Sequence, residues 1–83
     1  MIRKERLINL AQHLLRIDSQ NPPGREKEIA DFIARDMRIP GIDVRSVSYQ
    51  PNRPNIIAVL RGTGPRAKTD RAAILLTPHI DTV

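Results

Sequence analysis

The sequence predicts an α/β fold in which two helices are followed by three β-strands. Apolar residues recur at helical spacing in residues 4–17 and again in residues 25–38. β-branched and other apolar residues then gather in three short runs, at 42–49, 55–62 and 71–77, separated by Pro, Gly and Asn. The links between these runs are too short to hold a crossover helix. Neighbouring strands that pair directly should therefore run antiparallel.

The first helix is predicted from an apolar stripe that follows the i, i+3, i+4, i+7, i+8 pattern of one buried face. The stripe consists of Leu7, Leu10, Ala11, Leu14 and Leu15. The stretch DSQNPPG follows, and its two prolines end the helix and impose an extended link.

The second helix should begin near Gly24 or Arg25, with glutamates in its first turn and arginines in its last, as the helix dipole favours. The Pro-Gly pair at 40–41 ends it. Its predicted apolar face is Ile29, Phe32, Ile33 and Met37. We expect the two helices to cover one face of the sheet.

The three predicted strands differ in their patterns. Residues 42–49 alternate imperfectly, which is typical of a strand near an edge. The second run is apolar on both faces from Ile56 to Leu60, and the third run, 71–77, is apolar throughout. Strands of that kind need cover on both sides, and the two helices supply it on one. We therefore expect residues 1–83 to be the N-terminal part of a larger domain, whose remainder lies outside this sequence.

Composition narrows the function classes. The 83 residues suit one small domain or a piece of a larger one, and the absence of cysteine excludes disulfides and thiolate metal sites. The net charge is +5, but the basic residues are scattered among acidic ones, and no aromatic cluster or nucleic-acid motif accompanies them. No nucleic-acid partner is therefore predicted. The sequence has no secretory signal and no run long enough to cross a membrane. A soluble, cytoplasmic protein is expected.

The candidate chemistry lies at the end of the sequence, in TPHIDTV. In extended backbone His79 and Asp81 project to the same side, just beyond a buried strand, where α/β sheets gather ligands. Pro78 should end that strand. A neutral imidazole is a good zinc ligand, and a carboxylate on its other nitrogen fixes its tautomer. His-x-Asp alone is a weak signal, because a catalytic zinc needs three protein ligands.

The other polar residues have simpler interpretations. His13 is expected near the edge of the apolar stripe of the first helix, at the surface or at the boundary between surface and core. Ser19 has no group that would activate it as a nucleophile, so no hydrolase triad is predicted. Asp18 and Asn21 are interpreted as capping or turn residues, and RGTGP as a plain loop.

The order of motifs resembles the start of a known enzyme family. SQNPPG between two helices, then PGIDV, NRPNIIAVLRG and AILLTPHIDTV together resemble the dinuclear-zinc aminoacylase and carboxypeptidase family. That family includes acetylornithine deacetylase, succinyl-diaminopimelate desuccinylase, aminoacylase and glutamate carboxypeptidase. The resemblance covers essentially all 83 residues. One departure is Pro78, where the family usually has a glycine or another small residue.

The resemblance implies a zinc-peptidase catalytic domain with a mixed sheet. It implies that His79 is a metal ligand and that Asp81 is the catalytic aspartate that orients this histidine. It further implies two Zn²⁺ ions per complete site, with Co²⁺ as a possible substitute, and a metal-activated water that attacks an amide carbonyl. The substrate would be a small N-acyl amino acid or a peptide. The remaining ligands, the general base and a dimerisation domain that makes the full-length enzyme a homodimer would lie beyond Val83.

Two other hypotheses stay open from the sequence. One is a free-standing small basic α/β module that binds a partner or an anion without enzymatic activity. The other is an inert remnant of the fold. For the 83-residue chain by itself, we expect no measurable hydrolysis and weak zinc binding, since it offers one good ligand.

Overall fold

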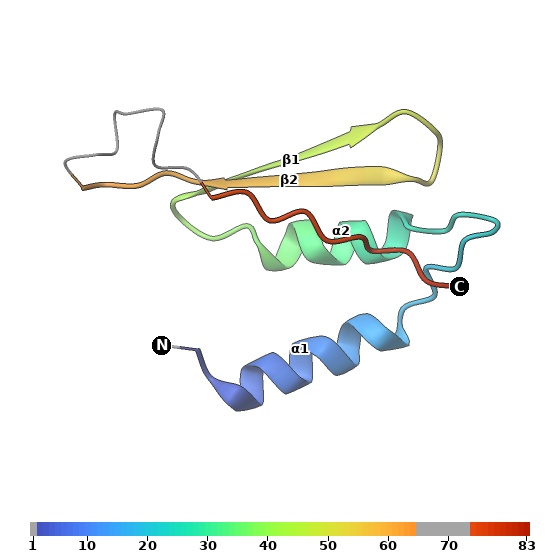
Figure 1. The fold of residues 1–83 in the computed structure, drawn as a ribbon, viewed down its shortest axis with the longest axis horizontal. Coiled ribbons are helices and arrows are strands. Elements are labelled where there is room, and N and C mark those ends of the chain that lie inside the picture. The colour runs from blue at the N-terminus through green and yellow to red at the C-terminus, as the bar shows by residue number, and fades with distance from the viewer. Residues whose placement is uncertain (1, 65–73) are drawn as a thin grey trace.

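The computed structural model describes residues 2–64 and 74–83. In chain order it contains α1 (Lys4–Arg16), α2 (Lys27–Asp36), β1 (Ile42–Ser48) and β2 (Pro54–Leu60) (Figure 1). The predicted order of two helices followed by strands is confirmed for these four elements, and the chain is a mixed α/β structure.

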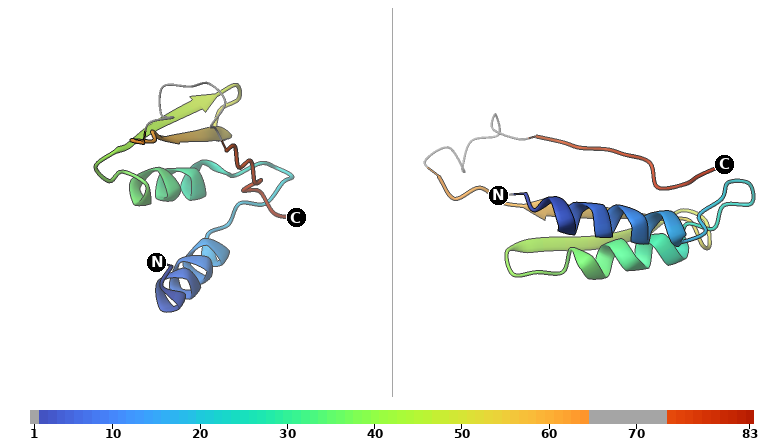
Figure 2. Two further views of the ribbon diagram at one scale, coloured as in Figure 1. Left: turned by 60° about the vertical axis from the view of Figure 1, so that its left-hand side comes forward. Right: turned by 90° about the horizontal axis from the view of Figure 1, so that it is seen from below.

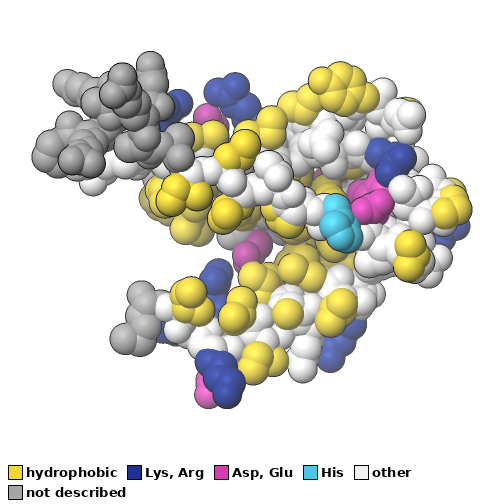
Figure 3. Space-filling model, in the orientation of Figure 1, with side chains coloured by type: hydrophobic (Ala, Val, Ile, Leu, Met, Phe, Trp, Pro, Cys, Tyr) yellow, Lys and Arg dark blue, Asp and Glu magenta, His cyan; other side chains and the backbone are white. Residues whose placement is uncertain are grey.

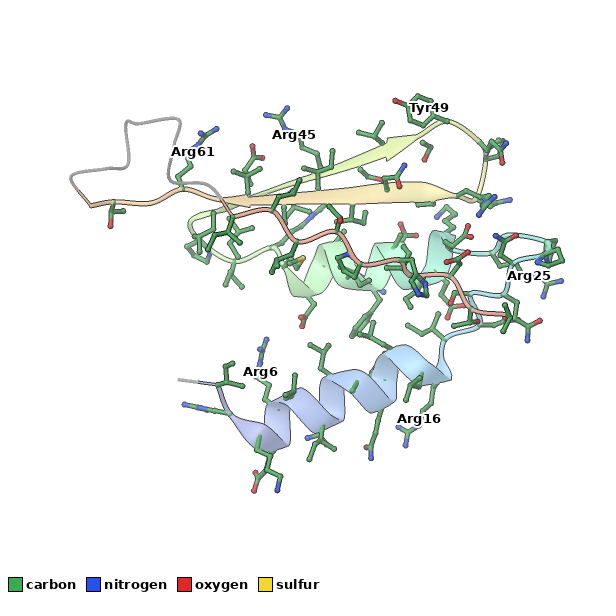
Figure 4. All side chains as sticks on the ribbon, in the orientation of Figure 1. Arg6, Arg16, Arg25, Arg45, Tyr49 and Arg61 are labelled. Atoms are coloured by element: carbon green, nitrogen blue, oxygen red, sulfur yellow. The ribbon has the colours of Figure 1, made fainter. Side chains whose placement is uncertain are left out.

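The strands β1 and β2 form an antiparallel pair whose register runs from Ile42 opposite Leu60 to Ser48 opposite Pro54. This pairing confirms the antiparallel arrangement that the short link predicts. Helix α2 packs against one face of the pair. In the part of the chain that the structure describes, the other face is uncovered, and it carries Arg45 and Tyr49 (Figure 4).

Helix α2 supplies the small core. Ile29, Ala30 and Ala34 are buried, whereas the predicted face residues Phe32, Ile33 and Met37 are half-buried. The two alanines are buried because their short side chains let the helix lie close to the sheet. The helix begins at Lys27, two or three residues later than predicted, because the backbone around Gly24 is still in a turn, with φ +91° at that glycine.

Helix α1 lies on the far side of α2 from the sheet, so the prediction that both helices cover the sheet is wrong (Figures 1 and 2). Its apolar stripe is not buried either, and Leu15 is 82% exposed. The physical reason is that α2 alone occupies the inner face of a two-stranded sheet. Amphipathic spacing identifies an apolar face without identifying what covers it.

A ring stack and an ion pair join α1 to α2. The rings of His13 and Phe32 stack with centroids 4.1 Å apart and planes inclined by 12°. Arg6 and Asp36 form a long ion pair of 3.9 Å. His13 is exposed apart from this stack, which agrees with the expected boundary position.

The third predicted strand, 71–77, is not confirmed. Residues 71–73 lie outside the described residues, and residues 74–77 form no strand. Ile74, Leu75 and Leu76 are 90%, 84% and 83% exposed, because no strand among the described residues pairs with them. The pairing that this end of the chain does make is a parallel bridge between Gln20 and Thr82.

The chain leaves more surface open than a self-contained domain would. Its accessible surface is 7757 Å², against about 5000 Å² expected for a folded monomer of this mass. The radius of gyration is 14.9 Å, against about 12 Å for a compact 83-residue domain. Hydrophobic side chains lie on both sides of the groove that separates α1 from the layer above it, which contains α2 and the strands (Figure 3). Across residues 2–64 and 74–83, none of the helices has the length and apolar character required to traverse a bilayer.

Candidate functional site

His79 and Asp81 lie together at the end of the described chain. His79 Nδ1 is 3.1 Å from Asp81 Oδ1 and 3.0 Å from the Asp81 carbonyl oxygen. Two acceptor oxygens at one ring nitrogen favour the tautomer in which Nδ1 carries the proton and donates it. The lone pair of the neutral ring is then on Nε2. Because the His79 side chain is 85% exposed, this ring is accessible to a ligand.

Asp81 is held from its other side by Asn21. The Asn21 side-chain amide Nδ2 donates to Asp81 Oδ2 at 3.1 Å, and the Asp81 side chain is 33% exposed. This hydrogen bond is the main reason that the pKa of Asp81 lies below its usual value, and the His79 hydrogen bond acts in the same direction. The carboxylate is therefore ionised at neutral pH and accepts from both neighbours.

Backbone hydrogen bonds place these side chains. The Asn21 N–H donates to the Thr82 carbonyl at 2.7 Å, and the Thr82 N–H donates to the Ser19 carbonyl at 2.9 Å. These two bonds form the parallel bridge between the SQNPPG link and the HIDTV segment. Both peptide bonds that precede Pro22 and Pro23 are cis.

The roles predicted for the link residues are partly corrected. Asp18 accepts from the Gln20 N–H at 3.2 Å, which fits the predicted turn role. Asn21 does more than shape a turn, because its side chain contacts Asp81 across 60 residues of sequence. No local pattern reveals such a contact. The co-occurrence of the two motifs in the resemblance was the one available signal.

Glu26 and Arg53 form a second feature that sequence reasoning missed. Arg53 Nε donates to Glu26 Oε2 at 2.9 Å, and Arg53 Nη2 donates to Glu26 Oε1 at 2.9 Å. The Glu26 side chain is 5% exposed. The guanidinium lowers the pKa of Glu26, and the carboxylate raises the pKa of Arg53. This bidentate pair fastens the start of α2 to the turn before β2.

Gly24 lies against the same guanidinium. A Cβ at this position would lie 2.7 Å from Arg53 Nε and 2.8 Å from Arg53 Cδ. Glycine therefore permits both the positive φ of +91° and the close approach of the arginine. The link that carries Asn21 is thus anchored on its far side by the Glu26–Arg53 pair.

Ser19 is fully buried, and its hydroxyl oxygen has no hydrogen-bond partner within the described residues. An unpartnered buried hydroxyl is destabilising. No described base contacts Ser19, so the structure gives no support to a serine nucleophile.

An open hollow of about 860 Å³ lies between the start of α2 and the β1–β2 turn. His79 and Asp81 do not line it. Several of its charged side chains are already paired, with Arg25 3.4 Å from Asp18 and Lys27 2.7 Å from Asp31. The hollow is therefore separate from the candidate chemistry.

His79, with its ring held by Asp81, fits the role of one ligand in a zinc site. A histidine whose Nδ1 is held by a carboxylate is a common arrangement for a zinc ligand. No group of three or more His, Cys, Asp or Glu side chains that could hold a metal occurs within residues 2–64 and 74–83. A catalytic zinc needs three protein ligands, so His79 would require further ligands from elsewhere.

Comparison with known proteins finds a similarity to a deformylase. The chain is 30% identical over 79 residues to N-formyl-4-amino-5-aminomethyl-2-methylpyrimidine deformylase of Bacillus subtilis (strain 168). The match covers 94% of this chain, and the chain spans only 18% of the length of that relative. No family model matches the chain, and no solved structure matches it. The similarity to a deformylase hints at a hydrolase family.

Proposed function

We propose that this chain is the N-terminal portion of the catalytic domain of a zinc-dependent hydrolase of amide bonds. The reaction would be of the N-acyl-amino-acid deacylase or carboxypeptidase type. The observation that carries the proposal is the exposed His79 ring with its Nδ1 bonded to Asp81. The deformylase relative supports the deacylase type, since a deformylase removes an N-acyl group of the smallest kind.

In this proposal the residues of the chain have distinct roles. His79 would bind zinc through Nε2, and Asp81 would hold the ring in the tautomer that leaves this nitrogen free. A bound zinc supplies Lewis acidity and lowers the pKa of a coordinated water. The other ligands and the general base would come from residues outside this chain.

The uncovered apolar surface supports a larger domain. The accessible surface of 7757 Å² and the exposed Ile74, Leu75 and Leu76 would be covered by further chain. We extend the proposal to a small-molecule amide substrate, a homodimeric full-length enzyme and a cytoplasmic location. By itself, the 83-residue chain is expected to hydrolyse no amide and to bind zinc weakly.

Metal titration of the 83-residue chain tests the metal-binding part. The two histidines, His13 and His79, provide an internal comparison. We expect Zn²⁺ to shift the ring resonances of His79, and Co²⁺ to broaden them, at lower metal concentration than those of His13. The His79→Ala variant should lose the response and His13→Ala should keep it. An equal response of both rings, or none at His79, contradicts the proposal.

A chimera tests the hydrolase part. This chain would replace the matching segment of the Bacillus subtilis deformylase, and hydrolysis would be measured on N-formyl, N-acetyl and N-succinyl amides. We expect activity in the chimera and its loss in the same chimera with His79→Ala. A folded, zinc-loaded chimera that is inactive on every amide, or an equally active His79→Ala version, would contradict the assignment.

A further inference from the structure

We propose that Asn21 is a positioning residue for the candidate zinc ligand His79 and that it acts through Asp81. The inference rests on the proposed function and adds to it a residue that lies 60 positions away in the sequence. Three groups form a continuous series. Asn21 Nδ2 donates to Asp81 Oδ2 at 3.1 Å, and His79 Nδ1 donates to Asp81 Oδ1 at 3.1 Å.

The carboxylate needs such a support. One oxygen of Asp81 is engaged by a ring that is itself 85% exposed, so His79 offers little restraint in return. The other oxygen is engaged by Asn21, which is half-buried and belongs to the anchored link. The Asn21 amide thus restricts rotation of the carboxylate. The carboxylate, together with the Asp81 carbonyl oxygen 3.0 Å from His79 Nδ1, restricts rotation of the imidazole.

The main chain of the same link holds the neighbouring residue. Hydrogen bonds from the Asn21 N–H to Thr82 and from the Thr82 N–H to Ser19 fix the backbone beside Asp81. The link is further closed by the Gly24 N–H, which donates to the Gln20 carbonyl at 2.9 Å. Substituting the Asn21 side chain leaves the peptide N–H in place, so its positioning role can be separated from the backbone bridge.

The negative charge of Asp81 requires a hydrogen-bond donor, such as the Asn21 amide, at position 21. An amide donates to the carboxylate, whereas an aspartate of nearly the same shape would present a second negative charge to it. Asn21→Asp therefore keeps the volume and reverses the interaction, and Asn21→Ala removes the donor. Asn55→Ala is a matched control, because Asn55 is exposed and lies on β2, which contains none of Asn21, His79 and Asp81.

The experiment measures two properties of the 83-residue chain and its variants. The first is the tautomer of the neutral His79 ring, from the ¹⁵N shifts of its two ring nitrogens without metal. The second is the affinity for Zn²⁺, from the His79 resonances during titration. We expect the Nδ1–H share to fall in Asn21→Ala and to fall further in Asn21→Asp. Zinc affinity should fall about tenfold or more, as when outer partners of metal ligands are removed. Asn55→Ala should match the parent chain.

The outcomes separate this inference from the proposed function. If the parent chain binds zinc at His79 and neither property changes in the Asn21 variants, the positioning role is refuted and the metal site stands. If the tautomer depends on Asn21 but His79 does not respond to zinc, the positioning geometry stands and the proposed function fails. Unfolding of both variants, seen as collapsed amide dispersion, would make Asn21 a structural residue and overturn the inference.

Discussion

Replacing Gly24 with alanine tests whether the Glu26–Arg53 pair anchors the link that carries Asn21. The structure supplies a control, because Gly41 has nearly the same positive φ angle. The φ angles are +91° at Gly24 and +93° at Gly41. A Cβ at Gly41 would meet nothing within 4 Å, whereas a Cβ at Gly24 would meet Arg53 Nε at 2.7 Å.

The expected magnitudes follow from this difference. A non-glycine residue held at such a φ costs about 1–3 kcal/mol, and both variants share that term. At Gly24 the arginine must also retreat from 2.7 Å to the 3.4 Å at which ordinary contacts begin. That retreat disturbs the hydrogen bonds of the guanidinium to the buried Glu26 carboxylate, and leaving such a buried group unpaired costs about 1–3 kcal/mol. Gly24→Ala should therefore lower the free energy of unfolding by about 1–3 kcal/mol more than Gly41→Ala does.

The assay is urea unfolding of the 83-residue chain, followed by circular dichroism at 222 nm. The Nε–H resonance of Arg53 provides a second readout, since it should lose its protection from exchange in Gly24→Ala and keep it in Gly41→Ala. Equal losses of stability in the two alanine variants, with an unchanged Arg53 resonance, would refute the idea that Gly24 is required by the guanidinium.

Three further predictions concern acid, the helix contact and the basic surface. Arg53 lowers the pKa of Glu26 below its ordinary value of 4.5. The pair therefore stabilises the fold above pH 4.5, and this stabilisation is lost as the pH falls through the folded-state pKa of Glu26. Glu26→Gln should flatten this acid dependence of stability, which circular dichroism between pH 2 and 6 would follow. Replacing Phe32 with leucine removes the stack on His13 and should weaken docking of α1 by about 1 kcal/mol, seen as faster amide exchange in α1 with β1 and β2 unchanged. Duplex DNA should bind weakly and without sequence preference, and a salt-sensitive, tight complex in a mobility-shift titration would instead favour the basic binding module.

The elements that the sequence predicted well depend on local pattern. Both helices, the hairpin and the antiparallel direction of its strands follow from apolar spacing, prolines and short links. The third strand could not be secured in the same way. The apolar run at residues 74–76 would form a strand only beside a partner strand, and none of the described residues supplies one.

The candidate site was predicted in part. The pairing of His79 with Asp81 follows from i, i+2 geometry, and the structure brings the two side chains together. The helix dipole alone explained an acidic residue such as Glu26 in the first turn of the second helix. Local sequence patterns therefore offered no reason to expect its contact with Arg53. The metal and catalytic roles of His79 and Asp81 remain predictions.

The parallel bridge between Gln20 and Thr82 has a consequence for the order in which the molecule assembles. The contact between Asn21 and Asp81 closes a loop of 60 residues. The chain entropy lost on closing such a loop costs about 3–4 kcal/mol of free energy. The hairpin and the helices need only short-range contacts and should form first. The site formed by Asn21, His79 and Asp81 should then be the last part to assemble and the first to open in mild denaturant, while the hairpin is still intact.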